Sequence, residues 1–149
     1  MGNRGVVERF RQAMEADDFD TQDALIHDDY ILDLPQSGER IRGRANRRAM
    51  IEQYPGRVET GMRPSVGRII GMDDQFVTPP FPAWNIIHLA GSGDEFQTTG
   101  TIRYPDGKLW HFVALMTLRE GRIWREVDYF AEPFDPPAWR SQYTERIGP

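Results

Sequence analysis

The protein has 149 residues, and a chain of this length is most simply one domain, so we expect a single domain over residues 1–149. Hydrophobic residues make up 39% and charged residues 28%, which is typical of a folded globular chain. Cysteine is absent, which excludes thiol nucleophiles, disulfides and cysteine metal sites. The net charge of −5 argues against nucleic acid and anionic membranes as partners. No apolar signal core or membrane span stands out, so we expect a soluble, cytoplasmic protein.

The first third of the chain is predicted to be mainly helical. Apolar residues at helical spacing predict an amphipathic helix over 6–14. A short second helix is predicted from about 21 to 26, and a β-rich run over 30–34 predicts a strand. A third helix is predicted over 45–51, where Pro and Gly follow and end it.

The second half of the chain is predicted to form strands. A β-rich stretch at 66–70 and a stiff proline loop at 78–82 come first. Four β-rich runs then follow one another, at 84–90, 96–104, 109–118 and 122–130. Short turn signals separate these runs, so we expect an antiparallel meander, followed by a short terminal helix over 138–147.

Helices followed by an antiparallel sheet predict an α+β layer fold. A long sheet curls because its strands twist, and helices that cover only its concave face leave a pocket between the two layers. The order of elements therefore favours one deep cavity for a small molecule.

Several short motifs resemble the nuclear transport factor 2-like superfamily, and in particular its SnoaL-like polyketide cyclase and ketosteroid isomerase branch. The motifs are Val6-Val7-Glu8-Arg9-Phe10, Asp17-Asp18-Phe19-Asp20, Asp28-Asp29-Tyr30, Pro35-Gln36-Ser37-Gly38-Glu39-Arg40-Ile41-Arg42-Gly43, Arg119-Glu120-Gly121-Arg122-Ile123 and Asp128-Tyr129-Phe130. The resemblance covers most of residues 5–134. It implies a cone-shaped α+β barrel, in which three N-terminal helices pack on a strongly curved mixed or antiparallel sheet, and it implies a homodimer.

The resemblance does not select one reaction, because this fold carries cyclases, isomerases, epoxide hydrolases, dehydratases and non-catalytic binders. Ketosteroid isomerases have a Tyr where this chain has Phe10, and an Asp where it has Leu34. Asp128-Tyr129-Phe130 matches the second half of the last-strand motif of limonene-epoxide hydrolases, whereas Glu126 and Val127 replace its first half. SnoaL-like cyclases use an acid/base carboxylate and a His in the cavity.

Asp128 is the leading catalytic candidate. If the last strand alternates, Trp124, Glu126, Asp128 and Phe130 share one face. A carboxylate among aromatic rings would have a raised pKa and would suit acid/base chemistry near neutral pH. Glu126 could share that chemistry on the same face. The structural alternatives are an Asp128 paired with an arginine and a Glu126 in a rim salt bridge.

Histidine could supply the partner of Asp128. His88 shares a strand face with Trp84, and His111 lies between Trp110 and Phe112; either could be the imidazole of an acid/base pair. Both could equally be structural residues. His27 is expected in a solvated, charged turn. The three His lack metal-ligand spacing, so we expect no metal.

Aromatic residues could form the walls of the cavity. Trp84, Trp110, Phe112 and Trp124 could hold a flat ligand, although ordinary core packing is the alternative. Tyr30 could donate a hydrogen bond to a carbonyl, or lie at the surface. The arginines at 40, 42, 44, 47, 48 and 57 are interpreted as a solvated, salt-bridged face.

We expect an enzyme that needs no cofactor and that performs acid/base cyclisation, isomerisation or dehydration on an apolar metabolite bearing a carbonyl or several rings. The alternative is a non-catalytic small-molecule binding protein, or a dimerisation module whose aromatic residues fill the cavity.

Overall fold

The computed structural model describes residues 1–53, 83–103 and 107–147, without the side chains of 83–87. Its helices are α1 (Asn3–Glu15), α2 (Phe19–Leu25) and α3 (Gly43–Glu52), with a 3₁₀ helix η1 (Ala138–Tyr143) near the C-terminus. Its strands are β1 (Ile26–Leu34), β2 (Glu39–Arg42), β3 (Ala83–Ser92), β4 (Glu95–Arg103), β5 (Leu109–Arg119) and β6 (Arg122–Ala131).

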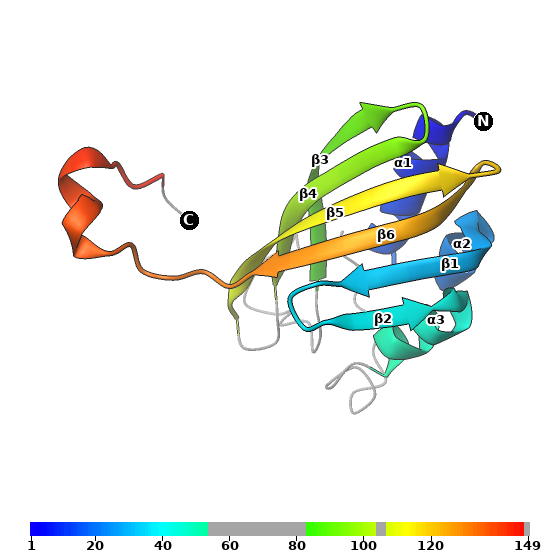
Figure 1. The fold of residues 1–149 in the computed structure, drawn as a ribbon, viewed down its shortest axis with the longest axis horizontal. Coiled ribbons are helices and arrows are strands. Elements are labelled where there is room, and N and C mark those ends of the chain that lie inside the picture. The colour runs from blue at the N-terminus through cyan, green and yellow to red at the C-terminus, as the bar shows by residue number, and fades with distance from the viewer. Residues whose placement is uncertain (54–82, 104–106, 148–149) are drawn as a thin grey trace.

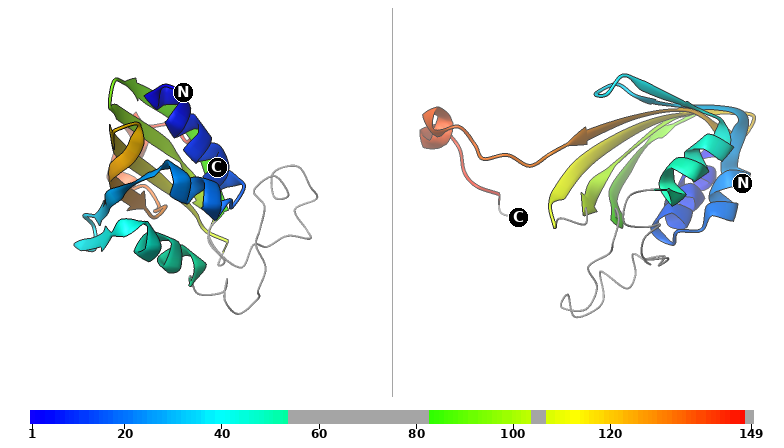
Figure 2. Two further views of the ribbon diagram at one scale, coloured as in Figure 1. Left: turned by 90° about the vertical axis from the view of Figure 1, so that its right-hand side faces the viewer. Right: turned by 90° about the horizontal axis from the view of Figure 1, so that it is seen from below.

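The six strands form one mixed sheet in the order β2-β1-β6-β5-β4-β3. Neighbouring strands are antiparallel except for β1 and β6, which run parallel. The sheet is strongly curved but not closed, and the three helices lie on its concave side (Figures 1 and 2). This arrangement confirms the predicted α+β fold of helices packed on a curved sheet.

The main core lies between α1 and the concave face of the sheet. The helical spacing of α1 turns Val6, Val7 and Phe10 to the sheet, where all three are buried. Strand alternation turns Phe96, Met116 and Leu118 toward them.

None of the described helices has both the length and the apolar character needed to cross a membrane.

The second helix and first strand differ from the prediction at their shared boundary. Asp18 caps α2, because its Oδ1 accepts a hydrogen bond from the Thr21 backbone N at 3.1 Å. The helix ends at Leu25, and the charged stretch 27–29 belongs to β1. The expectation of a solvated His27 is wrong: its side chain is buried, and its Nε2 lies 3.1 Å from Oε2 of Glu120.

The predicted alternation of β6 is wrong at its start. The pairing of β5 with β6 shifts between Thr117 and Leu118, which leaves Trp124 as the extra residue of a bulge. Ile123 is therefore fully buried together with Glu126, although simple alternation separates them.

Some expectations fall outside the described residues. These are the β-rich stretch at 66–70, the proline loop at 78–82 and the position of the Trp84 side chain. The predicted terminal helix over 138–147 is the shorter 3₁₀ helix η1, whose exposed Trp139 and Tyr143 do not pack on the sheet.

Candidate active site

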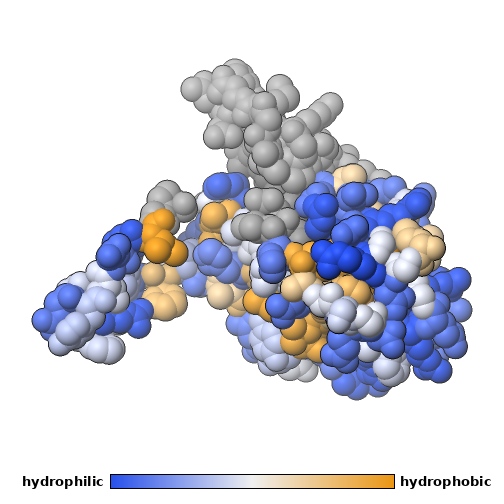
Figure 3. All heavy atoms as spheres, turned by 90° about the horizontal axis from the view of Figure 1, so that it is seen from above, coloured by the Kyte–Doolittle hydropathy of each residue, from blue (hydrophilic) through white to orange (hydrophobic). Residues whose placement is uncertain are grey.

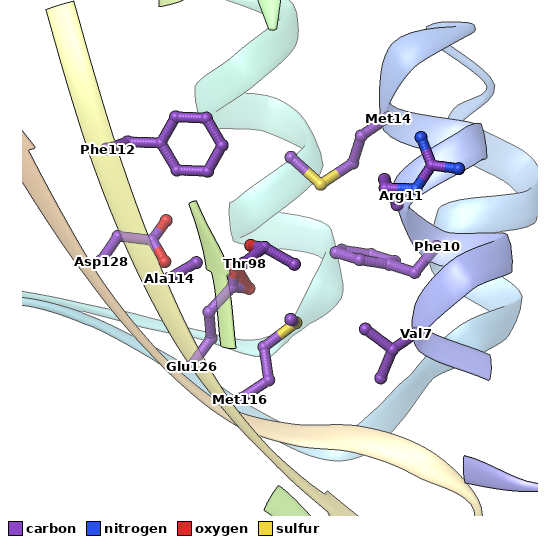
Figure 4. A pocket seen from close by; sticks show the side chains of 10 residues that line it. All are labelled: Val7, Phe10, Arg11, Met14, Thr98, Phe112, Ala114, Met116, Glu126 and Asp128. Atoms are coloured by element: carbon purple, nitrogen blue, oxygen red, sulfur yellow. The ribbon is translucent and has the colours of Figure 1, made fainter. Parts of the chain in front are cut away.

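The polar centre of the concave face is built from rows of side chains across the sheet. Thr98, Ala114 and Asp128 lie side by side on β4, β5 and β6, and Met116 lies beside Glu126 in the next row. Because Ala114 is small, it leaves open space beside the Asp128 carboxyl. Figure 4 shows that carboxyl pointing from the sheet into the gap in front of α1.

A hollow separates these rows from α1. It has an empty volume of about 300 Å³, which includes space open to solvent, while its enclosed part is about the size of a water molecule. The lining residues are Val7, Phe10, Arg11, Met14, Thr98, Phe112, Ala114, Met116, Glu126 and Asp128. Apolar walls thus surround two carboxyl groups.

Asp128 is 8% exposed, and its Oδ1 is buried with no hydrogen-bond partner among the described residues. Burial raises the pKa of Asp128 well above its ordinary value of 3.8, and the nearby charge and hydrogen bond of Glu126 raise it further. The Arg47 cation opposes part of this shift. The fold therefore favours the protonated form of Asp128 and leaves one of its oxygens open to a ligand.

Glu126 is anchored from β1. The Tyr30 hydroxyl donates a 2.6 Å hydrogen bond to Oε2 of Glu126, and both side chains are buried. Burial, together with the negative charge of Glu126, raises the pKa of Tyr30 well above 10.0, so its hydroxyl stays protonated and remains a donor. Tyr30 thereby fixes one oxygen of Glu126 next to Asp128.

Arg47 supplies a buried positive charge from α3. It is 2% exposed, its guanidinium lies 5.1 Å from the centre of the Phe10 ring, and its Nη1 donates a 2.8 Å hydrogen bond to Oε1 of Gln22. Gln22 in turn donates to the Ala13 carbonyl at 3.1 Å. The three helices thus hold one cation behind the Phe10 wall of the hollow.

The structure brings together only some of the predicted site residues. Asp128, Glu126 and Phe112 line the hollow, and Tyr30 lies behind it. His88 is exposed on β3, and His111 is exposed on the opposite side of β5 from Phe112. Neither imidazole lies in the described lining of the hollow.

Two of the predicted tryptophans lie elsewhere. Trp124 occupies the β6 bulge, and its ring lies 5.3 Å from the Arg119 guanidinium and 4.6 Å from that of Arg125. Trp110 is half-buried and is not part of the described lining. The bulge therefore moves Trp124 from the predicted cavity wall to a contact with arginines.

Other residues of the site were not singled out from the sequence. The α1 wall, with Phe10, Arg11 and Met14, follows from the predicted amphipathic helix, but its role as a cavity wall needs the packing of α1 on the sheet. The interpretation of the arginine cluster as a solvated, salt-bridged face is wrong for Arg47, which is buried. Its neighbours Arg44 and Arg48 do form ion pairs, with Asp28 and Asp23, each at 3.0 Å. No local sequence signal separates the buried arginine from the exposed ones.

Comparison with known proteins identifies the family. A model of the SnoaL-like domain matches residues 7–126. The chain belongs to the SnoaL-like family. No curated protein matches this SnoaL-like chain.

Solved structures confirm the nuclear transport factor 2-like fold of this SnoaL-like chain. An NTF2-like protein of unknown function from Burkholderia xenovorans LB400 is 33% identical, with 98% of this chain and 95% of that chain covered and a TM-score of 0.71. A protein provisionally designated a ketosteroid isomerase from Kribbella flavida is 20% identical, with 99% and 90% covered and a TM-score of 0.75. An LEH-like epoxide hydrolase from M. tuberculosis is 21% identical, with 84% and 79% covered and a TM-score of 0.52.

The described side chains suit proton transfer. Two adjacent carboxyl groups, one of them with a raised pKa, can exchange a proton with each other and with an oxygen or carbon in the hollow. Among the described residues, no three His, Asp or Glu side chains gather as a potential metal site.

Proposed function

We propose that this SnoaL-like protein is a cofactor-independent acid/base catalyst for a small, apolar molecule bearing a carbonyl group. The observation that carries the proposal is the unpartnered, buried Oδ1 of Asp128, which lies in an apolar hollow next to Glu126. A buried polar atom without a partner is costly, and a ligand that supplies one removes that cost.

In the proposed mechanism, Asp128 transfers the proton. After Asp128 has passed its proton to Glu126, its ionised carboxylate removes a proton from the carbon next to the carbonyl group of the ligand and returns that proton at another position. Glu126, held by Tyr30, receives or supplies the proton that Asp128 exchanges. Isomerisation, dehydration and cyclisation all need such a step.

The narrow hollow limits how a ligand enters. Its enclosed part holds about one water. A ring-bearing ligand therefore enters only when the α1 side chains that line the hollow move aside. Met14 is suited to this movement because its unbranched side chain adopts several shapes at little cost, and Arg11, bonded to Glu15 at 2.9 Å, lies beside it in the lining.

Hydrogen–deuterium exchange tests the proposal without knowledge of the natural substrate. Cyclohexanone in heavy water is followed by NMR for loss of the protons next to its carbonyl. We expect the protein to accelerate this exchange, and Asp128→Asn to reduce the acceleration about 100-fold or more. Asp33→Asn is the matched control, because Asp33 lies outside the hollow and pairs with Arg40 at 2.6 Å. Equal rates in Asp128→Asn and the parent protein would refute the assignment.

A second candidate function is ligand binding without chemistry. The observation that favours it is the absence of an imidazole from the described lining, together with the small enclosed volume. Binding of cyclohexanone, seen as NMR shifts of pocket residues, without any accelerated exchange in the parent protein would favour this alternative.

A further inference from the structure

The acid/base step proposed above needs a hydrogen-bond donor beside the carbonyl oxygen of the ligand. Removal of a proton from the neighbouring carbon places negative charge on that oxygen, and a fixed donor stabilises the charge. Asp128 cannot be this donor, because it receives the proton in the same step. Glu126 is held in place at its Oε2 by the Tyr30 hydroxyl. The step therefore calls for another polar group in the lining of the hollow.

Apart from the two carboxyl groups, the described lining holds two polar side chains, those of Arg11 and Thr98. The Arg11 side chain is 30% exposed, and its Nη1 bonds to Oε1 of Glu15 at 2.9 Å. Hydrophilic residues cover much of the face in Figure 3, where water satisfies their hydrogen bonds. Thr98 is instead only 4% exposed, and among the described residues no hydrogen bond joins its hydroxyl to another group. Its hydroxyl is thus available to a ligand.

The strand register places Thr98 and Asp128 on opposite sides of one small residue. Thr98 pairs with Ala114, and Ala114 pairs with Asp128, so the three lie in one row across the sheet (Figure 4). Neighbouring strands are about 4.8 Å apart, which puts about 10 Å between the Cα atoms of Thr98 and Asp128. A contact of about 3 Å at each end leaves space over Ala114 for a carbonyl oxygen and the carbon next to its carbonyl group. We call this space the Ala114 seat.

We propose that Thr98 is a further catalytic residue of the acid/base reaction, an assignment that rests on the proposed function. Its hydroxyl donates a hydrogen bond to the carbonyl oxygen of a ligand in the Ala114 seat. The Asp128 carboxylate takes a proton from the neighbouring carbon, and the electron pair of the broken C–H bond moves to the carbonyl oxygen as an enolate. Return of the proton to carbon restores the carboxylate. The ligand is accordingly a neutral ketone or aldehyde with a hydrogen on the carbon next to its carbonyl group.

Infrared spectra of bound cyclohexanone test the hydrogen bond without turnover. Comparison of unlabelled cyclohexanone with cyclohexanone carrying ¹³C at its carbonyl isolates the carbonyl band from the bands of the protein. A hydrogen bond lowers the stretching frequency, so we expect a lower band in the parent protein than in hexane. Thr98→Val keeps the branching of the side chain and should return the band to its position in hexane, whereas Thr98→Ser should keep it lowered. Thr99→Val is the matched control, because alternation along β4 turns Thr99 to the opposite face.

Hydrogen–deuterium exchange of cyclohexanone gives the second readout. At saturating cyclohexanone, Thr98→Val should lower the exchange rate about tenfold or more, and Thr98→Ser should recover most of it. A lowered band in a parent protein that does not accelerate exchange would refute the proposed function and still support the hydrogen bond from Thr98. A band that stays lowered in Thr98→Val overturns the assignment, and so does a parent spectrum without a lowered band.

A substitution at Ala114 tests the seat while both polar groups stay in place. Ala114→Val adds two methyl groups between Thr98 and Asp128, so it should raise the dissociation constant of cyclohexanone about tenfold or more. An NMR titration measures this constant in the parent protein and in the variant. An unchanged dissociation constant would show that the carbonyl group does not lie over Ala114, and would overturn the proposal.

Discussion

At the scale of single residues, the raised pKa of Asp128 links the site to stability. Burial and Glu126 favour its protonated form in the folded protein, so the fold holds a proton that the unfolded chain releases near pH 3.8. The free energy of unfolding that this proton contributes is fully present below that pH. It is lost as the pH rises through the raised pKa.

Asp128→Asn should remove this pH dependence, because the amide resembles the protonated carboxyl and does not ionise. We expect the variant to match the parent protein at acidic pH and to exceed its stability at alkaline pH by about 1 kcal/mol or more. Urea unfolding across that pH range measures the difference. A variant less stable than the parent at alkaline pH would contradict this account.

Arg47 has a measurable effect on the same carboxyl. Its cation lowers the pKa of Asp128, so Arg47→Met should raise that pKa further and destabilise the fold by about 1–3 kcal/mol. Carbon NMR of the Asp128 carboxyl reports the pKa directly. Arg48→Met is the matched control, since Arg48 pairs with Asp20 at 2.8 Å on the surface; an equal shift in that variant would show that the effect is not specific.

The residues of the site were predictable to different degrees. Asp128 and Phe112 could be chosen because strand alternation and apolar neighbours are local signals. Trp124 could not be placed, because a bulge reverses the alternation and its position depends on the partner strand. The burial of Arg47 depends on α2 and α3 packing together, which no local pattern encodes.

At the scale of elements, the β3–β4 hairpin depends on a glycine. Gly91 has a φ of +125°, and a Cβ there would collide with the Glu95 carbonyl oxygen and with Cα of Phe96. The turn residues predicted this hairpin because Gly91-Ser92-Gly93 interrupts two β-rich runs. No local sequence pattern predicts the pairing of β1 with β6, because the paired residues of the two strands lie far apart in the sequence.

Gly91→Ala should therefore destabilise the protein more than Gly93→Ala. Gly93 also has a positive φ, of +65°, but a Cβ there meets open space, so its substitution should cost about 1–2 kcal/mol for backbone strain alone. Gly91→Ala adds a backbone clash and should cost more. Thermal unfolding of the two variants makes the comparison, and equal losses would show that the hairpin shifts to admit the Cβ.

At the scale of the whole molecule, the layer order of the fold was predictable and the size of its hollow was not. Helices followed by strands predict a curved sheet with helices on its concave side, as observed. The volume left between the layers depends on individual side chains, such as Met14 and Ala114, that meet across it.

The parallel pairing of β1 with β6 also governs when the protein can finish folding. β1 lies between β2 and β6 in the sheet, and β6 is its last strand in the chain. During synthesis the edge of β1 that pairs with β6 stays without its partner until β6 has left the ribosome. The hydrogen bond between Tyr30 and Glu126 joins the same two strands, β1 and β6. Tyr30 and Glu126 thus come together only after β6 has been synthesised, and a nascent chain that lacks β6 lacks the hydrogen bond that holds Glu126 beside Asp128.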